Sequence, residues 1–164
     1  MQWTPKVLSL AFLVLAPPTL AQSAIERHAW QDRGLFEPFS RTAMAITGAI
    51  VLWGNPDFAE QGSTMQMTFE AGRSIDLVSV GASWREWDLG GGKQTAEVFR
   101  VAGEPGEPLN GNTLCGGDVT YLAFSEGNLL PGIRFLQLAA FSGEDVPVDI
   151  NSAGLCGTFS YELE

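Results

Sequence analysis

The amino-acid sequence predicts an all-β protein, an antiparallel sandwich or small barrel of about seven or eight strands with a short N-terminal helix. Short segments rich in β-branched, aromatic and alternating apolar residues recur along the chain, and turn residues separate almost every pair of them. No second helical pattern follows the first. The chain has 164 residues, of which 45% are hydrophobic, so it can bury the core of one ordinary domain. We expect that domain to span residues 40–164.

Residues 1–21 have the pattern of a signal peptide. Lys6 supplies a positive charge, the run from Val7 to Ala16 is apolar but too short to span a bilayer, and small residues lead up to Ala21. We therefore expect cleavage near Ala21 and a periplasmic or secreted protein. No stable membrane insertion is expected, because no later apolar stretch is long enough to cross a bilayer.

The segment 22–39 is expected to be helical. Ser23 and Glu26 form a capping-box pattern for a short helix over 24–33, and Gly34 stands where such a helix would end. This segment would precede the β domain.

The first predicted strand runs from Thr42 to Trp53, where β-branched and apolar residues dominate and Gly48 indicates a bulge or a close approach of another segment. The clearest strand signal covers 64–70, because three large apolar residues alternate strictly with polar ones. A short turn at 71–73 then predicts a hairpin. The remaining predicted strands are Ser74–Val80, Gln94–Val101, Val119–Ser125, Ile133–Phe141 and Thr158–Leu163, with 84–93 expected to be a loop or broken strand.

Two cysteines, Cys115 and Cys156, each stand in a Leu-Cys-Gly tripeptide. In an oxidising compartment two such thiols form a disulfide more often than a metal site. The bridge would tie the loop before one strand to the start of the last strand. In the chain-entropy model a loop of this length stabilises the fold by about 4 kcal/mol.

The charge balance excludes nucleic acid as a partner. There are 19 acidic against 9 basic side chains, a formal net charge of −10, and Lys93 is the only lysine after the predicted cleavage site. Nucleic-acid binding requires a basic stripe that displaces counterions from phosphates. A basic envelope protein is a better electrostatic match, and acidity also promotes solubility.

The candidate binding surface is formed by Trp84, Glu86, Trp87 and Asp88. Paired indoles beside carboxylates are typical of surfaces that bind a glycan or a protein. In an extended segment, residues three apart face opposite sides, so one tryptophan would belong to the core. In a turn, both could project together.

No catalytic residue, metal site or cofactor is predicted. His28 is the only histidine, and no Ser-His-Asp arrangement surrounds it. The glycine run before Lys93 lacks the spacing of a phosphate loop. Asp149, Asn151 and Gly154 match part of a calcium loop, but the chain lacks the oxygen ligand at position five and the glutamate at position twelve. The oligomeric state does not follow from the sequence.

Three stretches resemble a family of small exported bacterial proteins of unassigned function, namely Thr42–Gly48, Leu109–Gly116 and Leu155–Glu162. The resemblance implies a shared architecture with a disulfide and assigns no catalytic residue. In general shape the chain is also similar to periplasmic lysozyme inhibitors, which are small disulfide-bonded β-barrels that meet a basic enzyme. Their inhibitory loop motif is absent from this sequence, so the similarity concerns the fold alone.

These observations favour an exported, non-catalytic β domain that binds a partner or ligand in the cell envelope. One alternative is an inhibitor of a basic cell-wall-active enzyme such as lysozyme. Another is a barrel that holds a small apolar ligand, in which case Met44, Met65, Met67 and Phe69 would line a cavity rather than fill a core.

Overall fold

The computed structural model describes Met1 and residues 34–54, 61–88, 93–103, 111–130 and 133–163. For 82–88, 93–95, 127–130 and 134 it describes the backbone alone. The expected helix over 24–33, His28 and residues 2–21 of the expected signal peptide lie outside the described residues. No helix in the described part of the chain has the length and apolar character of a membrane span.

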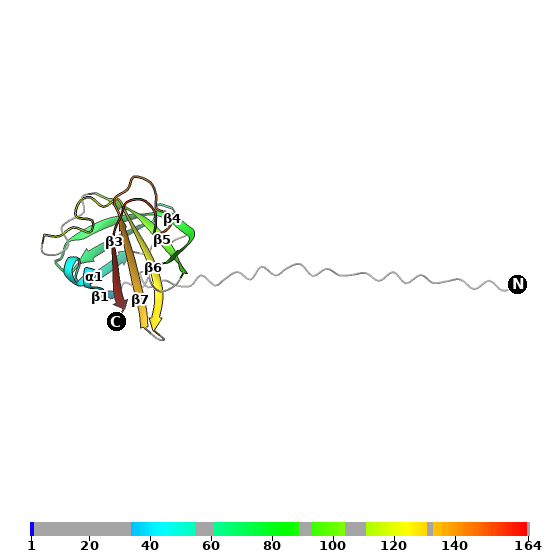
Figure 1. Ribbon diagram of the computed structural model, residues 1–164, viewed down its shortest axis with the longest axis horizontal. Coiled ribbons are helices and arrows are strands. Elements are labelled where there is room, and N and C mark those ends of the chain that lie inside the picture. The colour runs from blue at the N-terminus through cyan, green and yellow to red at the C-terminus, as the bar shows by residue number, and fades with distance from the viewer. Residues whose placement is uncertain (2–33, 55–60, 89–92, 104–110, 131–132, 164) are drawn as a thin grey trace.

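Eight antiparallel strands in the described residues form a closed barrel (Figure 1). Each strand pairs with its neighbours in sequence, and the first pairs with the last. Closure leaves no free sheet edge and decides between the two expected architectures in favour of the barrel. The elements are β1 (Leu35–Pro38), α1 (Arg41–Ile46), β2 (Ile50–Gly54), β3 (Thr64–Phe69), β4 (Ser74–Asp88), β5 (Lys93–Ala102), β6 (Tyr121–Leu130), β7 (Ile133–Phe141) and β8 (Leu155–Leu163).

The end of the segment expected to be helical is instead strand β1. Phe36 lies opposite Ile50 of β2 on one side and Leu163 of β8 on the other, and its side chain is fully buried. Burial of one large aromatic side chain between two distant strands outweighs the local pattern. The barrel therefore begins at Leu35 rather than at residue 40.

The strand expected from Thr42 to Trp53 is wrong in its first half, because Arg41–Ile46 forms helix α1. Ser40 caps this helix by accepting a hydrogen bond on Oγ from the backbone N–H of Ala43 at 3.1 Å. Ala43 is buried against the end of the barrel. The cap and this contact outweigh the β-branched content of the segment, and the strand starts only at Ile50.

The predicted alternation in β3 is confirmed. Met65, Met67 and Phe69 are buried, whereas Thr64 and Gln66 are exposed and Thr68 is half-buried. The apolar side chains of β3 join those of the other strands in the barrel interior. Phe99 and Phe124 pack edge to face there, with ring centroids 5.5 Å apart.

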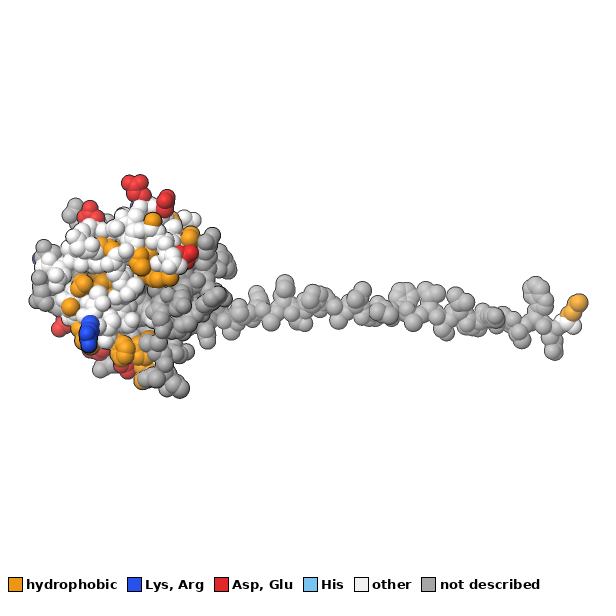
Figure 2. Space-filling model, viewed as in Figure 1, with side chains coloured by type: hydrophobic (Ala, Val, Ile, Leu, Met, Phe, Trp, Pro, Cys, Tyr) orange, Lys and Arg blue, Asp and Glu red, His pale blue; other side chains and the backbone are white. Residues whose placement is uncertain are grey.

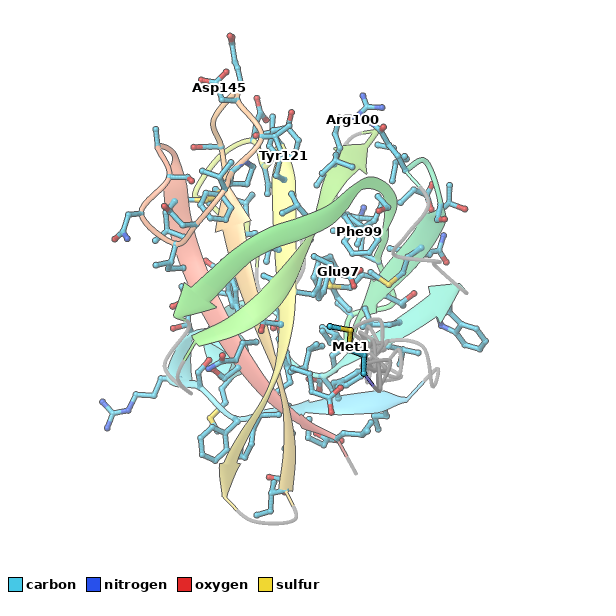
Figure 3. All side chains as sticks on the ribbon, turned by 90° about the vertical axis from the view of Figure 1, so that its right-hand side faces the viewer. Met1, Glu97, Phe99, Arg100, Tyr121 and Asp145 are labelled. Atoms are coloured by element: carbon cyan, nitrogen blue, oxygen red, sulfur yellow. A yellow bond between two sulfur atoms is a disulfide. The ribbon has the colours of Figure 1, made fainter. Side chains whose placement is uncertain are left out.

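Two polar residues share the buried, inward-facing side of β4 and β5. Ser79 lies opposite Phe99, and Glu97 lies opposite Phe124. Both are almost fully buried, Glu97 at 3% exposure. Figure 3 shows Glu97 below Phe99 within the barrel.

Strand β4 is longer than expected and includes the first half, residues 84–88, of the segment expected to be a loop or broken strand. It continues to Asp88 and pairs with β5 through two shifts of register, between Ser79 and Ala82 and between Ala82 and Glu86. Gly81, at the first shift, has a positive φ of 101°. The other predicted strands are confirmed, although β6 continues to Leu130, five residues past its predicted end, and β8 starts three residues early, at Leu155.

A second apolar cluster lies on the outer face of β5, β6 and β7. Its buried members are Ala96, Val98, Tyr121, Ala123, Ala139 and Phe141. Ile150, from the connection between β7 and β8, packs against it. This contact holds the connection against the barrel wall.

The predicted disulfide between Cys115 and Cys156 is confirmed, with 5.0 Å between the two Cα atoms. It joins the loop before β6 to the start of β8, as expected. Leu114, next to Cys115, is buried in the main core. The bridge therefore holds this loop over one end of the barrel.

Candidate binding surface at the disulfide-bonded end

Three of the connections at one end of the barrel run from β1 to β2, from β5 to β6 and from β7 to β8, because successive connections of an up-and-down barrel alternate between its ends. The first contains helix α1. Asn112, in the second, donates from Nδ2 to the backbone oxygen of Ala45 in α1 at 3.3 Å. Together with the disulfide, this bond links the three connections into one surface.

The β7–β8 connection, residues 142–154 and hereafter the acidic loop, is closed and stiffened by its own hydrogen bonds. The backbone N–H of Ser142 donates to the oxygen of Gly154 at 2.9 Å. Ser152 Oγ accepts from the backbone N–H groups of Val148 at 2.9 Å and Asp149 at 3.1 Å. Asp149 Oδ1 in turn accepts from the N–H of Asn151 at 2.9 Å. Side-chain oxygens that accept hydrogen bonds from nearby backbone N–H groups in this way fix the backbone geometry of the turn.

Thr120 and Tyr121, at the start of β6, hold the acidic loop through hydrogen bonds to its backbone. Tyr121 donates its hydroxyl hydrogen to the backbone oxygen of Glu144 at 3.2 Å. Thr120 Oγ1 lies 2.5 Å from the oxygen of Gly143 and 3.1 Å from that of Phe141. The loop is therefore held from within and from the strand that it covers.

The outer side of the acidic loop presents apolar side chains between carboxylates. Val146 is 47% exposed and Val148 is 41% exposed, while Pro147 between them is buried. Glu144 and Asp145 are exposed beside Val146. Figure 2 shows acidic side chains at the top of the molecule, over the place of this loop in Figure 1, and Figure 3 shows Asp145 near the top of the loop.

A hollow of about 500 Å³ lies beside the acidic loop, between the end of β5 and the start of β6. Arg100 and Asp118, both exposed, line it together with Tyr121. Figure 3 shows Arg100 across from Tyr121 at the same end of the barrel.

The structure does not bring the four residues of the predicted binding surface to this end. The backbones of Trp84, Glu86, Trp87 and Asp88 belong to β4, and the last of them pairs with Lys93 at the β4–β5 connection. That connection is at the other end of the barrel. Their side chains lie outside the described part of the structure, so the predicted surface stays a prediction.

Other sequence-based candidates now have definite positions. Asp149 and Asn151, considered as calcium ligands, form the turn of the acidic loop. Met65, Met67 and Phe69 are buried in the packed interior. In the alternative of a barrel that holds an apolar ligand, Met44 would line the same cavity, but it is 55% exposed on α1. The alternative is wrong for Met44, because the segment forms a helix on which Ala43, not Met44, faces the core.

Sequence reasoning missed the exposed valines of the acidic loop and Trp53 on β2. The run of Val146, Pro147 and Val148 within an acidic stretch was a sequence signal for the exposed valines. Trp53 was counted only as a residue of a strand, although it lies on the face opposite to buried Leu52 and is 52% exposed.

The fold and this surface define a closed, up-and-down antiparallel barrel with an internally hydrogen-bonded acidic loop at its disulfide-bonded end. No family model, curated protein or solved structure matches the chain.

Proposed function

We propose that this protein is an exported, non-catalytic binding domain that engages a basic protein of the cell envelope through the acidic loop. The observation that carries the proposal is the exposure of Val146 and Val148 among carboxylates on a loop held by internal hydrogen bonds. Exposed apolar side chains rimmed by charged ones are characteristic of protein-binding surfaces.

Charge supports a basic partner. The chain has a formal net charge of −10, and Glu144, Asp145 and Asp118 are exposed at this end. Complementary charge speeds association and selects among partners, while the apolar contacts contribute to the lifetime of the complex.

Stiffness supports an inhibitor-like role. A loop that is already ordered by Ser152 and Tyr121 loses little conformational entropy when it binds. We therefore propose, as the more specific form of this function, inhibition of a basic cell-wall-active enzyme such as lysozyme.

Export is proposed on two grounds. Residues 1–21 carry the signal-peptide pattern. The two cysteines are paired, which is typical of proteins in oxidising compartments.

The test is binding to a basic lysozyme, followed by calorimetry at low and high salt, together with an assay of the enzyme's activity. We expect binding that weakens as salt rises and that lowers enzyme activity. The double variant Glu144→Gln/Asp145→Asn should bind more weakly. The control Glu37→Gln/Glu162→Gln removes two charges that face each other across β1 and β8.

The two double variants separate a local site from a general charge effect. If both weaken binding equally, net charge alone acts and the acidic loop is not the site. If lysozyme does not bind at low salt, the inhibitor form of the proposal is wrong. A pull-down from envelope extract at low salt that captures no basic protein would contradict the broader form as well.

A further inference from the structure

A second hollow lies on the outer wall of the barrel, over β2, β3 and β4. Trp53, Gln66 and Asp76 stand side by side there, because Trp53 pairs with Gln66 and Gln66 pairs with Asp76 across adjacent strands. The Trp53 side chain is 52% exposed, and Gln66 and Asp76 are exposed as well. The exposed indole ring of Trp53 therefore lies at one end of a row that continues with Gln66 and Asp76.

The hollow has a volume of about 520 Å³ and is also lined by Thr64, Val78 and Ala102. Binding sites for small molecules have volumes of about 300 to 1,000 Å³. This groove could therefore hold a ligand of a few rings along the barrel wall.

The polar part of the groove has a defined orientation. Gln66 Nε2 donates a hydrogen bond to Asp76 Oδ1 at 2.9 Å, which orients the carboxamide along the row. That bond uses one of the two amide hydrogens of Gln66 and one of the two oxygens of Asp76. The same pair thus retains the capacity to donate and to accept hydrogen bonds at fixed positions.

We propose that this groove binds a short oligosaccharide of amino sugars. A sugar ring has an apolar C–H face, which matches the exposed indole of Trp53, and hydroxyl groups at its edge, which match Gln66 and Asp76. An ammonium group on the sugar is attracted by the Asp76 carboxylate and by the face of an indole.

Charge selects the kind of sugar. The net charge of −10 and the Asp76 carboxylate in the groove both repel acidic glycans. The same charges favour a ligand with free amino groups over a neutral one. This site is separate from the acidic loop and does not rest on the function proposed for it.

The experiment is titration calorimetry with three tetrasaccharides: glucosamine, its N-acetylated form and galacturonate. We expect the amino form to bind most tightly, the N-acetylated form more weakly and the acidic form not at all. Trp53→Ala should lower affinity for the amino form roughly 3- to 10-fold, the range of an aromatic stacking contact. Asp76→Asn should reduce the preference for the amino form over the N-acetylated form.

Met44→Ala provides the matched control, because Met44 is an equally exposed apolar side chain on α1. It should leave affinity unchanged, and Trp53→Phe should retain part of it. Circular dichroism of each variant checks the fold. Failure of both the amino and N-acetylated forms to bind the wild-type protein would overturn the proposal, as would undiminished binding by Trp53→Ala.

Discussion

Tyr161 buries its hydroxyl group inside the barrel, where its oxygen lies 2.8 Å from Thr47 Oγ1. Thr47 Oγ1 is also 3.0 Å from the backbone oxygens of Ala43 and Gly48. Since the threonine has one hydrogen to donate and a carbonyl receives it, Tyr161 donates to Thr47. This bond links the end of α1 to β8. Burial raises the pKa of Tyr161 far above its ordinary value. The Thr47 hydroxyl opposes that rise in part, because it can turn its hydrogen toward the oxygen of an ionised Tyr161.

This burial predicts a loss of stability in alkali. Up to a pH of about 10 the tyrosine is protonated in both the folded and the unfolded chain. At higher pH the unfolded chain releases the proton and the folded chain retains it. The contribution of Tyr161 to the free energy of unfolding therefore falls by up to about 1.4 kcal/mol per pH unit.

Urea unfolding of wild type and Tyr161→Phe between neutral pH and pH 11 measures the effect. At neutral pH the variant should be less stable by about 1 kcal/mol, because Thr47 Oγ1 loses its donor. This difference in the free energy of unfolding between the two proteins should become smaller at alkaline pH. A gap that stays constant with pH would mean that Tyr161 ionises with its ordinary pKa in the folded protein.

Gly48 has a positive φ of 61° and packs against the side chain of Glu70. Glu70 Oε2 accepts a hydrogen bond from the backbone N–H of Ala49 at 3.1 Å, so the carboxylate is held close to the turn. Gly72 has a similar φ of 78°, but no atom would contact an added Cβ.

The two glycines form a matched pair. Gly48→Ala should destabilise the protein by more than Gly72→Ala, for which backbone strain alone costs about 1 kcal/mol. The difference between the two losses of stability measures the energetic cost of displacing the Glu70 side chain. Thermal unfolding of both variants gives the comparison, and equal melting temperatures would show that Glu70 moves aside at no cost.

Strand β3 has one buried face and one face that is exposed or half-buried, so the two faces can be compared by mutation. Met67 is fully buried and Gln66, the preceding residue, is exposed. Met67→Ala should cost about 2 to 5 kcal/mol, since it removes buried side-chain volume from a packed interior. Gln66→Ala should cost no more than about 0.5 kcal/mol. Urea unfolding of the two variants would contradict the register of β3 if the order were reversed.

The acidic loop offers a test of its stiffness. Ser152→Ala removes the oxygen that accepts from two backbone N–H groups, at Val148 and Asp149. Hydrogen exchange of those amides should become faster, while the barrel amides should not change. Asn151→Ala is the control, because Asn151 contributes its backbone N–H to the turn. Equal exchange in the two variants would remove the structural support for a stiff binding loop.

The disulfide joins two parts of the barrel that are 41 residues apart in the sequence. The double variant Cys115→Ser/Cys156→Ser should lower the free energy of unfolding by about 4 kcal/mol in the chain-entropy model. Reductant should lower the melting temperature of the wild-type protein and leave that of the double variant unchanged. Identical melting temperatures for the oxidised wild type and the variant would contradict a stabilising bridge.

Much of the barrel could be predicted from local sequence. Alternation identified β3, turn residues separated most of the strands, and two cysteines left one possible intramolecular pairing. Strand β1 and helix α1 were missed because their patterns conflict with their tertiary contacts. Phe36 belongs to a strand because it pairs with Ile50 and Leu163, which are distant in the chain. The candidate surfaces were missed because exposure depends on what the rest of the chain covers.

Composition and local pattern alone predict an acidic, all-β domain with one pair of cysteines available for a bridge. These properties depend on composition and on the two-residue period of a strand, both of which are local. That the sheet closes into a barrel and that Val146, Val148 and Trp53 are exposed became known from the folded molecule. Closure depends on the pairing of β1 with β8, and exposure depends on packing across the chain, so no single segment encodes either.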